Sequence, residues 1–289
     1  MTFQLVTDAT ADLPFDVIKD NQLVELDMDI SIGERSYRTV GDNRITTDQL
    51  LVELGKGQRP VTSAVAIGEV QEVFMNCAKE GTEVLYLTFS SGLSGTFQSA
   101  NIAREAVLET FPEAKITIVD SLAAASGEGY LLEEVLKWRD EGKTVEEIVE
   151  LLKTLIPRLR SWFMVDDLNV LARGGRISKT VAVVGTMASI KPVLDVDPSG
   201  HLRAVSKARG TKKAVSMLIN NTISEFDEAY PRIIVSYSGA SDLAEAAKKE
   251  FFKVFPNITV DIRPLGPVIS AHTGSGTIAI FSVGKTKRA

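Results

Sequence analysis

The feature that most constrains the fold is an alternation of apolar, strand-like runs with helical patterns across the first half of the chain. The runs predict strands at residues 3–6, 24–30, 84–89 and 116–119, separated by helices near 47–54, 70–77 and 97–109 and followed by one at 123–139. Strands that alternate with helices in this way imply a mostly parallel, doubly wound sheet with helices on both faces. Ligands of such sheets bind beyond the carboxyl ends of the strands, where the strand order reverses.

The second half predicts another α/β unit with a mixed sheet and helices. A helix at residues 144–155 precedes it, and strands are expected at 163–165, 190–196, 201–205, 232–236, 258–263 and 277–283. Pro198 and Gly200 mark a turn between two successive strands, which is typical of a hairpin. The 289 residues suffice for two domains. We expect an N-terminal α/β domain at residues 1–160 and a C-terminal α/β domain at 161–289.

Composition excludes several classes of protein. The apolar fraction of 44% and charged fraction of 24% are ordinary for a soluble protein, and no apolar run approaches the length of a membrane span. The first residues lack the basic and apolar segments of a signal peptide, so we expect a cytoplasmic protein with no integral membrane segment. A net charge of −6 argues against binding to nucleic acid. The basic residues 285–288 are expected to be a solvated end.

Cysteine and histidine are too scarce for an internal disulfide or a cysteine-based zinc site. Cys77 is the single cysteine, and its apolar neighbours predict a buried position on a helix. Two separated histidines and one cysteine cannot form a zinc site without carboxylates, and the acidic pieces lack calcium-loop spacing. We therefore predict neither a metal nor a cofactor.

A turn rich in hydroxyl groups joins the strand at 84–89 to the following helix. It carries Ser90, Ser91, Ser94 and Thr96, with Gly92 and Gly95 between them. Glycines let the backbone approach a ligand, and the helix start directs N–H groups toward an anion. The turn has no lysine for a Walker loop, and its spacing differs from that of a nucleophile elbow. The simpler alternative is a plain connection in which Ser94 or Thr96 caps the helix.

Two other loops carry groups suited to anions. His272 lies in a loop with Gly274 and Gly276, where it either contacts an anion, transfers a proton or only stabilises the turn. The turn at residues 173–176 places two arginines around two glycines and could present both to a phosphate or an acidic partner. Other basic positions in the same half are Lys191, Lys207 and Arg209. Solvated charges are the ordinary explanation of these residues.

Taken together, these segments resemble the DegV family of bacterial fatty-acid-binding proteins. The matching pieces are TDATADL at 7–13, PVTS at 60–63, SSGLSGTFQSA at 90–100, GGRI at 174–177, IKP at 190–192, KARG at 207–210, and His272. The resemblance runs from about residue 3 to residue 283 as one unit. Their order and number are what make the match specific, since each piece alone is short.

The resemblance implies a carrier that encloses one long-chain fatty acid and is not itself an enzyme. Carried over by position, Thr62 and Ser94 bind the carboxylate, with Ser63, Gly95, Thr96 and His272 assisting. The family presents the acid to a partner fatty acid kinase, which forms acyl phosphate for phospholipid synthesis. On that basis Arg173, Lys191 and Arg209 serve phosphoryl transfer or docking of the partner. Residues 181–190, Ile67, Val70, Phe74 and Phe97 either line the acyl tunnel or are ordinary core.

The chain departs from the family pattern at two places. Residues 64–66 read Ala-Val-Ala where the family often has Gln-Pro-Ser, and Ser275 stands where it tends to have proline. Both departures affect the expected head-group pocket or the partner contact. Three alternatives stay open: a Ser94-based acyl hydrolase with His272 and Asp8 or Asp120, a small-ketone kinase-like enzyme that uses His272, and a regulatory interaction protein.

Overall fold

The N-terminal half forms the expected parallel sheet. The computed structural model describes residues 3–41, 43–178, 190–239 and 241–289. Four parallel strands lie in the order β2-β1-β6-β7, with bounds β1 Gln4–Asp8, β2 Val24–Leu26, β6 Val84–Thr88 and β7 Ile116–Asp120. Because β1 has β2 on one side and β6 on the other, the strand order reverses beside β1. The turns after β1 and β6 therefore lie at the expected ligand position.

Helices cover both faces of this sheet because successive side chains of a strand point to opposite faces. Val84 and Tyr86 of β6 pack with α3 (Ile67–Glu80) and α4 (Thr96–Thr110), and the buried Cys77 lies in that layer as predicted. Leu85 and Leu87 pack on the other face with α5 (Ser126–Asp140) and α6 (Val145–Leu155). The short helix α1 (Phe15–Asp20) follows β1. The doubly wound prediction is confirmed.

The strand predicted at residues 24–30 is wrong, because the chain leaves the sheet after Leu26. The buried Asp27 carboxylate accepts hydrogen bonds from the backbone nitrogen of Thr39 at 2.7 Å and from its hydroxyl at 2.6 Å. These bonds turn the chain into a separate antiparallel sheet in the order β4-β3-β5. Its strands are β3 Ile30–Ile32, β4 Arg35–Tyr37 and β5 Val61–Thr62, with α2 (Thr47–Gly55) between the last two.

The C-terminal half contains a six-stranded mixed sheet in the order β10-β9-β8-β13-β11-β12. β11 and β12 are parallel, and the remaining neighbours are antiparallel. The strands are β8 Leu159–Met164, β9 Ile190–Val196, β10 Leu202–Arg209, β11 Arg232–Tyr237, β12 Thr259–Pro264 and β13 Ile278–Val283. The helices are η1 Ile156–Arg158, α7 Leu168–Arg173, α9 Thr211–Glu225, α10 Asp242–Val254 and α11 Pro267–Thr273. The mixed α/β prediction for this half is confirmed.

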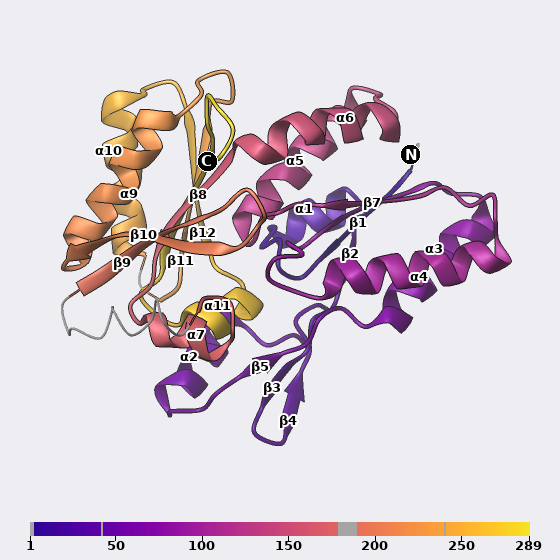
Figure 1. The fold of residues 1–289 in the computed structure, drawn as a ribbon, viewed down its shortest axis with the longest axis horizontal. Helices are drawn as coiled ribbons and strands as arrows, with labels where there is room; N and C mark the ends of the chain where they lie inside the picture. Colours follow the sequence, from indigo (N-terminus) through magenta and orange to yellow (C-terminus); the bar gives the residue numbers. More distant parts are fainter. Residues whose placement is uncertain (1–2, 42, 179–189, 240) are drawn as a thin grey trace.

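The two sheets share one core layer. Buried side chains of α5, including Tyr130 and Leu132, belong to the same apolar cluster as Leu85 of the first sheet and Phe281 of the second. Figure 1 shows α5 between the two groups of strands. The boundary expected at residue 160 falls inside β8, so no flexible linker separates the halves there. Among the described residues, no helix is both long and apolar enough to cross a bilayer.

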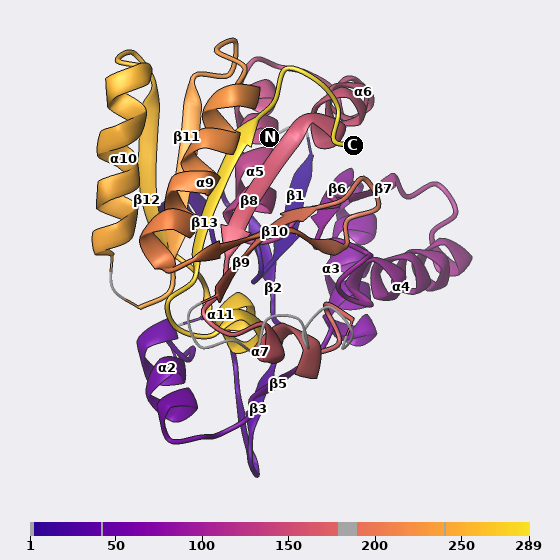
Figure 2. The same ribbon diagram turned by 60° about the vertical axis from the view of Figure 1, so that its left-hand side comes forward.

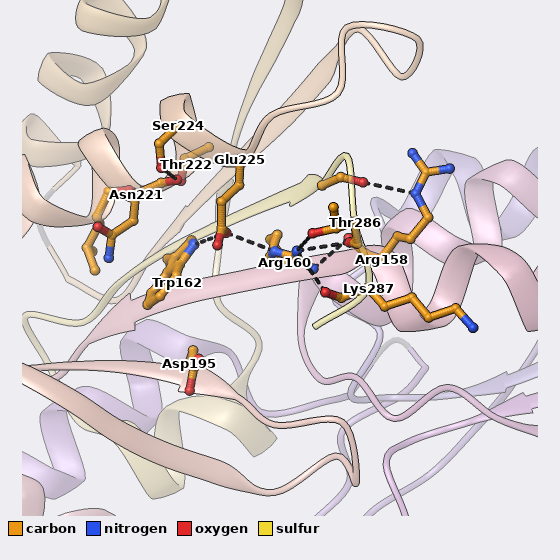
Figure 3. A network of polar contacts seen from close by, with 12 residues as sticks. Arg158, Arg160, Trp162, Asp195, Asn221, Thr222, Ser224, Glu225, Thr286 and Lys287 are labelled. Carbon is orange, nitrogen blue, oxygen red and sulfur yellow. Dashed lines mark hydrogen bonds and ion pairs between the residues drawn. The ribbon is translucent and has the colours of Figure 1, made fainter. Parts of the chain in front are cut away.

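The basic C-terminal end is exposed at residues 285–287, as expected, but its backbone and Arg288 are bonded to the rest of the protein. Arg160 is 6% exposed and donates from Nη2 to the carbonyl of Thr286 at 2.9 Å and from Nε to Glu225 at 2.8 Å (Figure 3). Arg288 donates from Nη1 to the carbonyl of Leu122 at 3.0 Å. The buried guanidinium of Arg160 needs acceptors, and the carbonyls of the tail supply them.

Candidate functional site

A largely apolar cavity, lined by residues of both halves of the chain, lies between the two sheets. One wall comes from the N-terminal half, with Met28, Phe89 and Leu93. The opposite wall comes from β8, β13, α11 and the β9–β10 hairpin, and includes Phe163, Val196, Leu202, Val268, Ala279 and Phe281. Nearly all of these side chains are hydrocarbon, so the cavity favours an apolar ligand over water.

Three polar side chains gather at one part of this wall. Thr62 Oγ1 lies 2.8 Å from Nε2 of His272, and both residues line the cavity. Arg176 also lines it, and donates from Nε to the carbonyl of Leu93 at 3.0 Å and from Nη1 to the carbonyl of Gly174 at 2.6 Å. A hydroxyl, an imidazole and a guanidinium therefore surround one part of an otherwise apolar space, which is a suitable environment for one small anionic group.

His272 is held as a neutral imidazole. Burial, and to a smaller extent the nearby positive charge of Arg176, lower its pKa from 6.5 to about 4. A β-carbon placed on Gly174 would lie 2.5 Å from Nδ1 of His272, so the ring occupies space that only glycine leaves free. The GGRI segment therefore positions His272 and supplies Arg176.

Thr96 bonds the hydroxyl-rich turn to the loop that follows β5. Thr96 Oγ1 accepts a hydrogen bond from the backbone nitrogen of Val65 at 3.3 Å and lies 2.9 Å from Ser94 Oγ. Ser94 Oγ in turn accepts from the backbone nitrogen of Thr96 at 3.2 Å. If Thr96 donates its hydroxyl proton to Ser94, the hydroxyl proton of Ser94 is free for an external acceptor. Gly95 occupies the N-cap position of α4 without a side-chain bond, so the alternative in which Ser94 or Thr96 caps the helix is wrong.

The remaining predicted members of this turn occupy different positions. Gly95 faces Ala64, whose β-carbon lies 3.8 Å from the position of an added Cβ. Ser63 is exposed, and its backbone nitrogen donates to the carbonyl of Asp29 at 3.0 Å. The cavity wall contains Leu93, which residues 94–96 follow in the chain without lining the cavity. Thr62 and His272 line it themselves.

The close approach that Gly92 permits is made to the second domain. A β-carbon on Gly92 would lie 2.8 Å from the carbonyl carbon of Gly200, in the β9–β10 turn. Ser90 Oγ donates to the carbonyl oxygen of Gly200 at 2.9 Å. Figure 2 shows the hairpin extending from the second sheet toward β6 and β7. The hydroxyl-rich turn thus holds the two domains together over the cavity as well as starting a helix.

The polar side chains of the turn after β1 form hydrogen bonds inside the protein. Asp8 is fully buried and accepts from the backbone nitrogens of Thr10 at 3.1 Å and Phe89 at 3.0 Å. The hydroxyl of Thr10 donates to Glu128 at 2.9 Å, and burial raises the pKa of both carboxyl groups. Pro14 occupies the N-cap position of α1 without a side-chain bond, so this turn provides no side-chain cap for the helix.

The predicted partner-facing cations lie outside the cavity. Arg173 is exposed on the last turn of α7, and Arg209 is exposed at the end of β10. Lys191 forms an ion pair with Asp166. The pairing of Ile190 with Arg209 and of Lys191 with Ala208 puts these two cations at the same end of the hairpin.

The sequence did not distinguish which arginine of the 173–176 turn lines the cavity, and it left the role of four apolar side chains open. Arg176 was noted only as part of a basic turn, although it is the arginine that lines the cavity. The flanking glycines were the available signal. Of the two alternatives for Ile67, Val70, Phe74 and Phe97, lining is excluded because the cavity wall contains none of them, and Val70 and Phe74 are core residues. Of the apolar run at 181–190, residues 181–189 lie outside the described part of the chain.

The fold and the site together define a two-domain α/β protein with an apolar cavity between its sheets. The chain belongs to the DegV family, whose model, described as "Uncharacterised protein, DegV family", matches residues 2–285. DegV domain-containing protein YteA of Lactococcus lactis subsp. lactis is 54% identical over 288 residues, which cover 100% of both chains.

Solved structures of the family share this architecture. A fatty-acid-binding DegV family protein from Thermus thermophilus superimposes with a TM-score of 0.87 at 31% identity, covering 98% of this chain and 100% of that protein. DegV from Bacillus subtilis, described as a fatty acid binding protein, gives a TM-score of 0.85 at 27% identity over 99% of this chain and 100% of its own. The predicted family and the two-domain α/β fold are confirmed.

Proposed function

We propose that this protein binds one long-chain fatty acid in the cavity between its sheets. The observation that carries the proposal is an apolar cavity with Thr62, His272 and Arg176 at one place on its wall. Each methylene group transferred from water into such a space contributes about 0.8 kcal/mol, so the acyl chain supplies most of the affinity. The fatty acid binding described for the relatives from T. thermophilus and B. subtilis supports the same ligand class.

The carboxylate is expected at the polar end. A buried carboxylate needs an opposite charge and hydrogen-bond donors, and Arg176 provides both. When Nε2 of His272 carries the hydrogen and donates it to Thr62 Oγ1, the hydroxyl proton of Thr62 is available to the ligand. Ser94 offers a second hydroxyl proton from the start of α4 through the arrangement with Thr96 described above. We place Ser63, Gly95 and Thr96 in support of these two donors.

A carrier role also fits the positions of the hydroxyls and the imidazole better than hydrolysis does. A serine nucleophile needs a base within hydrogen-bond reach, but Ser94 Oγ contacts Thr96, while His272 Nε2 contacts Thr62. We propose that the protein acts in the cytoplasm as a non-enzymatic carrier, which presents the carboxylate to a separate fatty acid kinase. Arg173, Lys191 and Arg209 are the cations proposed for that contact or for phosphoryl transfer.

Ligand binding is tested by denaturing extraction of the purified protein and mass spectrometry, followed by titration of the delipidated protein with palmitate and oleate. We expect one fatty acid per chain. Thr62→Val and Ser94→Ala should each weaken binding by about fivefold to tenfold, since each removes a hydrogen bond of about 1 kcal/mol. Ser31→Ala is the matched control, because Ser31 is an exposed hydroxyl on β3, the strand that pairs with β5. A lipid-free protein that also refuses both added acids rejects the proposal.

The partner role is tested with the loaded protein, a purified bacterial fatty acid kinase, ATP and hydroxylamine. Acyl phosphate formed on the bound acid is trapped as an acyl hydroxamate, which the carrier alone should not produce. Arg173→Glu and Arg209→Glu should lower the hydroxamate yield at low kinase concentration while leaving fatty acid affinity unchanged. Equal yields from these variants and the wild type would remove both arginines from the proposed contact.

A further inference from the structure

One hydroxyl-bearing residue of the cavity wall, on β8, has no hydrogen-bond partner for its side chain. Ser161 of β8 lines the cavity and is 5% exposed. Its Oγ atom is buried and has no hydrogen-bond partner. Among the buried side-chain atoms without a partner in the described residues, this is the one that belongs to the cavity wall. Leaving a buried hydroxyl without a partner is energetically unfavourable, so a ligand that pairs with it gains affinity.

The strand register places Ser161 deep in the cavity. Ser161 pairs with Phe281 of β13, and Phe163 pairs with Ala279 two residues nearer to Thr277. Thr277 also lines the cavity, and its hydroxyl donates to the carbonyl of Gly274, which directly follows the helix that carries His272. Four residues of extended chain from Thr277 to Phe281 cover about 13 Å. Ser161 therefore faces the middle of a bound long chain, well away from its carboxylate.

The surroundings of Ser161 offer no substitute partner within the protein. The nearest backbone is the first turn of α5, where a β-carbon on Gly127 would lie 3.4 Å from Ser161 Oγ and 2.8 Å from the ring of Phe281. The neighbouring hydroxyl of Ser126 is already paired with Ser236 at 2.9 Å. Phe281, Phe163 and Ala125 supply only hydrocarbon to this part of the wall.

We propose that the cavity selects a fatty acid with an oxygen substituent near the middle of its chain, and that Ser161 is the residue that recognises it. A serine hydroxyl can donate to a hydroxyl or keto oxygen and can accept from a hydroxyl. A plain methylene chain leaves Ser161 unpaired, whereas a mid-chain hydroxyl satisfies both groups at once. The inference rests on the proposed function, because it names the ligand class of the same cavity.

The test compares stearate, 10-hydroxystearate, 12-hydroxystearate and 2-hydroxystearate as ligands of the delipidated protein. A hydroxyl at carbon 2 lies beside the carboxylate and is the positional control. Ser161→Ala removes the proposed partner. Ser282→Ala is the matched control, because Ser282 is 1% exposed and its Oγ is also unpartnered, but it does not line the cavity.

For each protein, the affinity for a mid-chain hydroxystearate is divided by the affinity for stearate. For at least one hydroxystearate, we expect this ratio to be about tenfold higher in the wild type than in Ser161→Ala. The ratio for Ser282→Ala should equal that of the wild type, and 2-hydroxystearate should show no dependence on Ser161. If stearate binds but Ser161→Ala leaves the ratio of hydroxystearate to stearate affinity unchanged, this inference alone is overturned. The Ser161 hydroxyl is then assigned to an ordered water. Failure of every fatty acid to bind overturns the proposed function instead.

Discussion

Thr62 Oγ1 and His272 Nε2 lie 2.8 Å apart although 210 positions separate the two residues in the chain. The contact joins β5 of the small sheet to α11 of the C-terminal half. The polar part of the cavity is therefore built jointly by both halves, and it forms only when they are packed together. This dependence makes the contact a useful probe of ligand binding.

The first prediction concerns the coupling of these two residues. In a double-mutant cycle, Thr62→Val and His272→Gln should each weaken palmitate binding, and the double variant should lose less than the sum. Directly bonded residues show interaction energies of about 0.5–3 kcal/mol. Dissociation constants of the four delipidated proteins, measured by calorimetry, give the coupling. Additive losses would mean that Thr62 and His272 act on the ligand independently.

The second prediction follows from the lowered pKa of His272. The folded value of about 4 lies below the reference value of 6.5, so the unfolded chain binds more protons between these two pH values. The stability that neutral His272 contributes is thus fully present above pH 6.5 and is lost as the pH falls toward 4. Urea unfolding of the lipid-free protein at pH 7.0 and 4.5 should show a larger loss for the wild type than for His272→Gln. The difference should be of the order of 1–3 kcal/mol.

A bound carboxylate gives an internal control for the same experiment. Its negative charge favours the protonated imidazole, so the loaded protein should show a higher pKa for His272 and a smaller loss of stability on acidification. An identical pH dependence of the wild type and His272→Gln in the lipid-free state would contradict the assignment of this pKa.

The third prediction concerns Gly174. Its φ of −69° suits alanine, but the added β-carbon would lie 2.5 Å from Nδ1 of His272. Gly174→Ala should therefore displace the ring, break its contact with Thr62 and weaken palmitate binding by roughly tenfold. Gly68→Ala is the control, since Gly68 lies in helix α3 with no atom within 4 Å of the added carbon. In a Thr62→Val background the effect of Gly174→Ala should shrink, and an undiminished effect would point to a different cause.

Much of the architecture could be predicted from the sequence because hydrophobic patterning is a local signal. Residues 84–89 form a continuous apolar run that indicates a strand, and the structure packs its alternate side chains against the helices on both faces of the sheet. The break after Leu26 escaped prediction, because it depends on the buried Asp27 carboxylate and its bonds to Thr39. No apolar pattern marks a bond across 12 residues of chain.

The site could be predicted only in part, because some of its residues come together only in the folded chain. Family motifs pointed to Thr62 and His272, but only the fold brings Arg176 into the cavity and leaves Arg173, three residues earlier, exposed. Arg173 is the last residue of α7, and the turn that follows, with Gly175 at a φ of +76°, decides which of the two arginines faces inward. The interdomain role of Gly92 was also hidden, because its partner Gly200 lies in the other half of the chain.

The last prediction concerns the hairpin that covers the cavity. Val196 and Leu202 flank the β9–β10 turn and line the cavity, and the turn is held by the bond from Ser90 Oγ to the carbonyl of Gly200. Ser90→Ala removes this bond, worth about 1 kcal/mol, and should speed fatty acid dissociation by about fivefold. Stopped-flow displacement of a fluorescent fatty acid by excess oleate measures the rate.

A second variant and a control separate loosening of the hairpin from damage to the turn. Gly200→Ala places a β-carbon 2.1 Å from Ser90 Oγ at a residue with φ of +80°, so it should push the hairpin away and speed dissociation further. Ser91→Ala alters an exposed hydroxyl one residue along and should leave the rate unchanged. If both Ser90→Ala and Gly200→Ala fold and release the ligand at the wild-type rate, the acid leaves by another route and the hairpin serves only to join the domains.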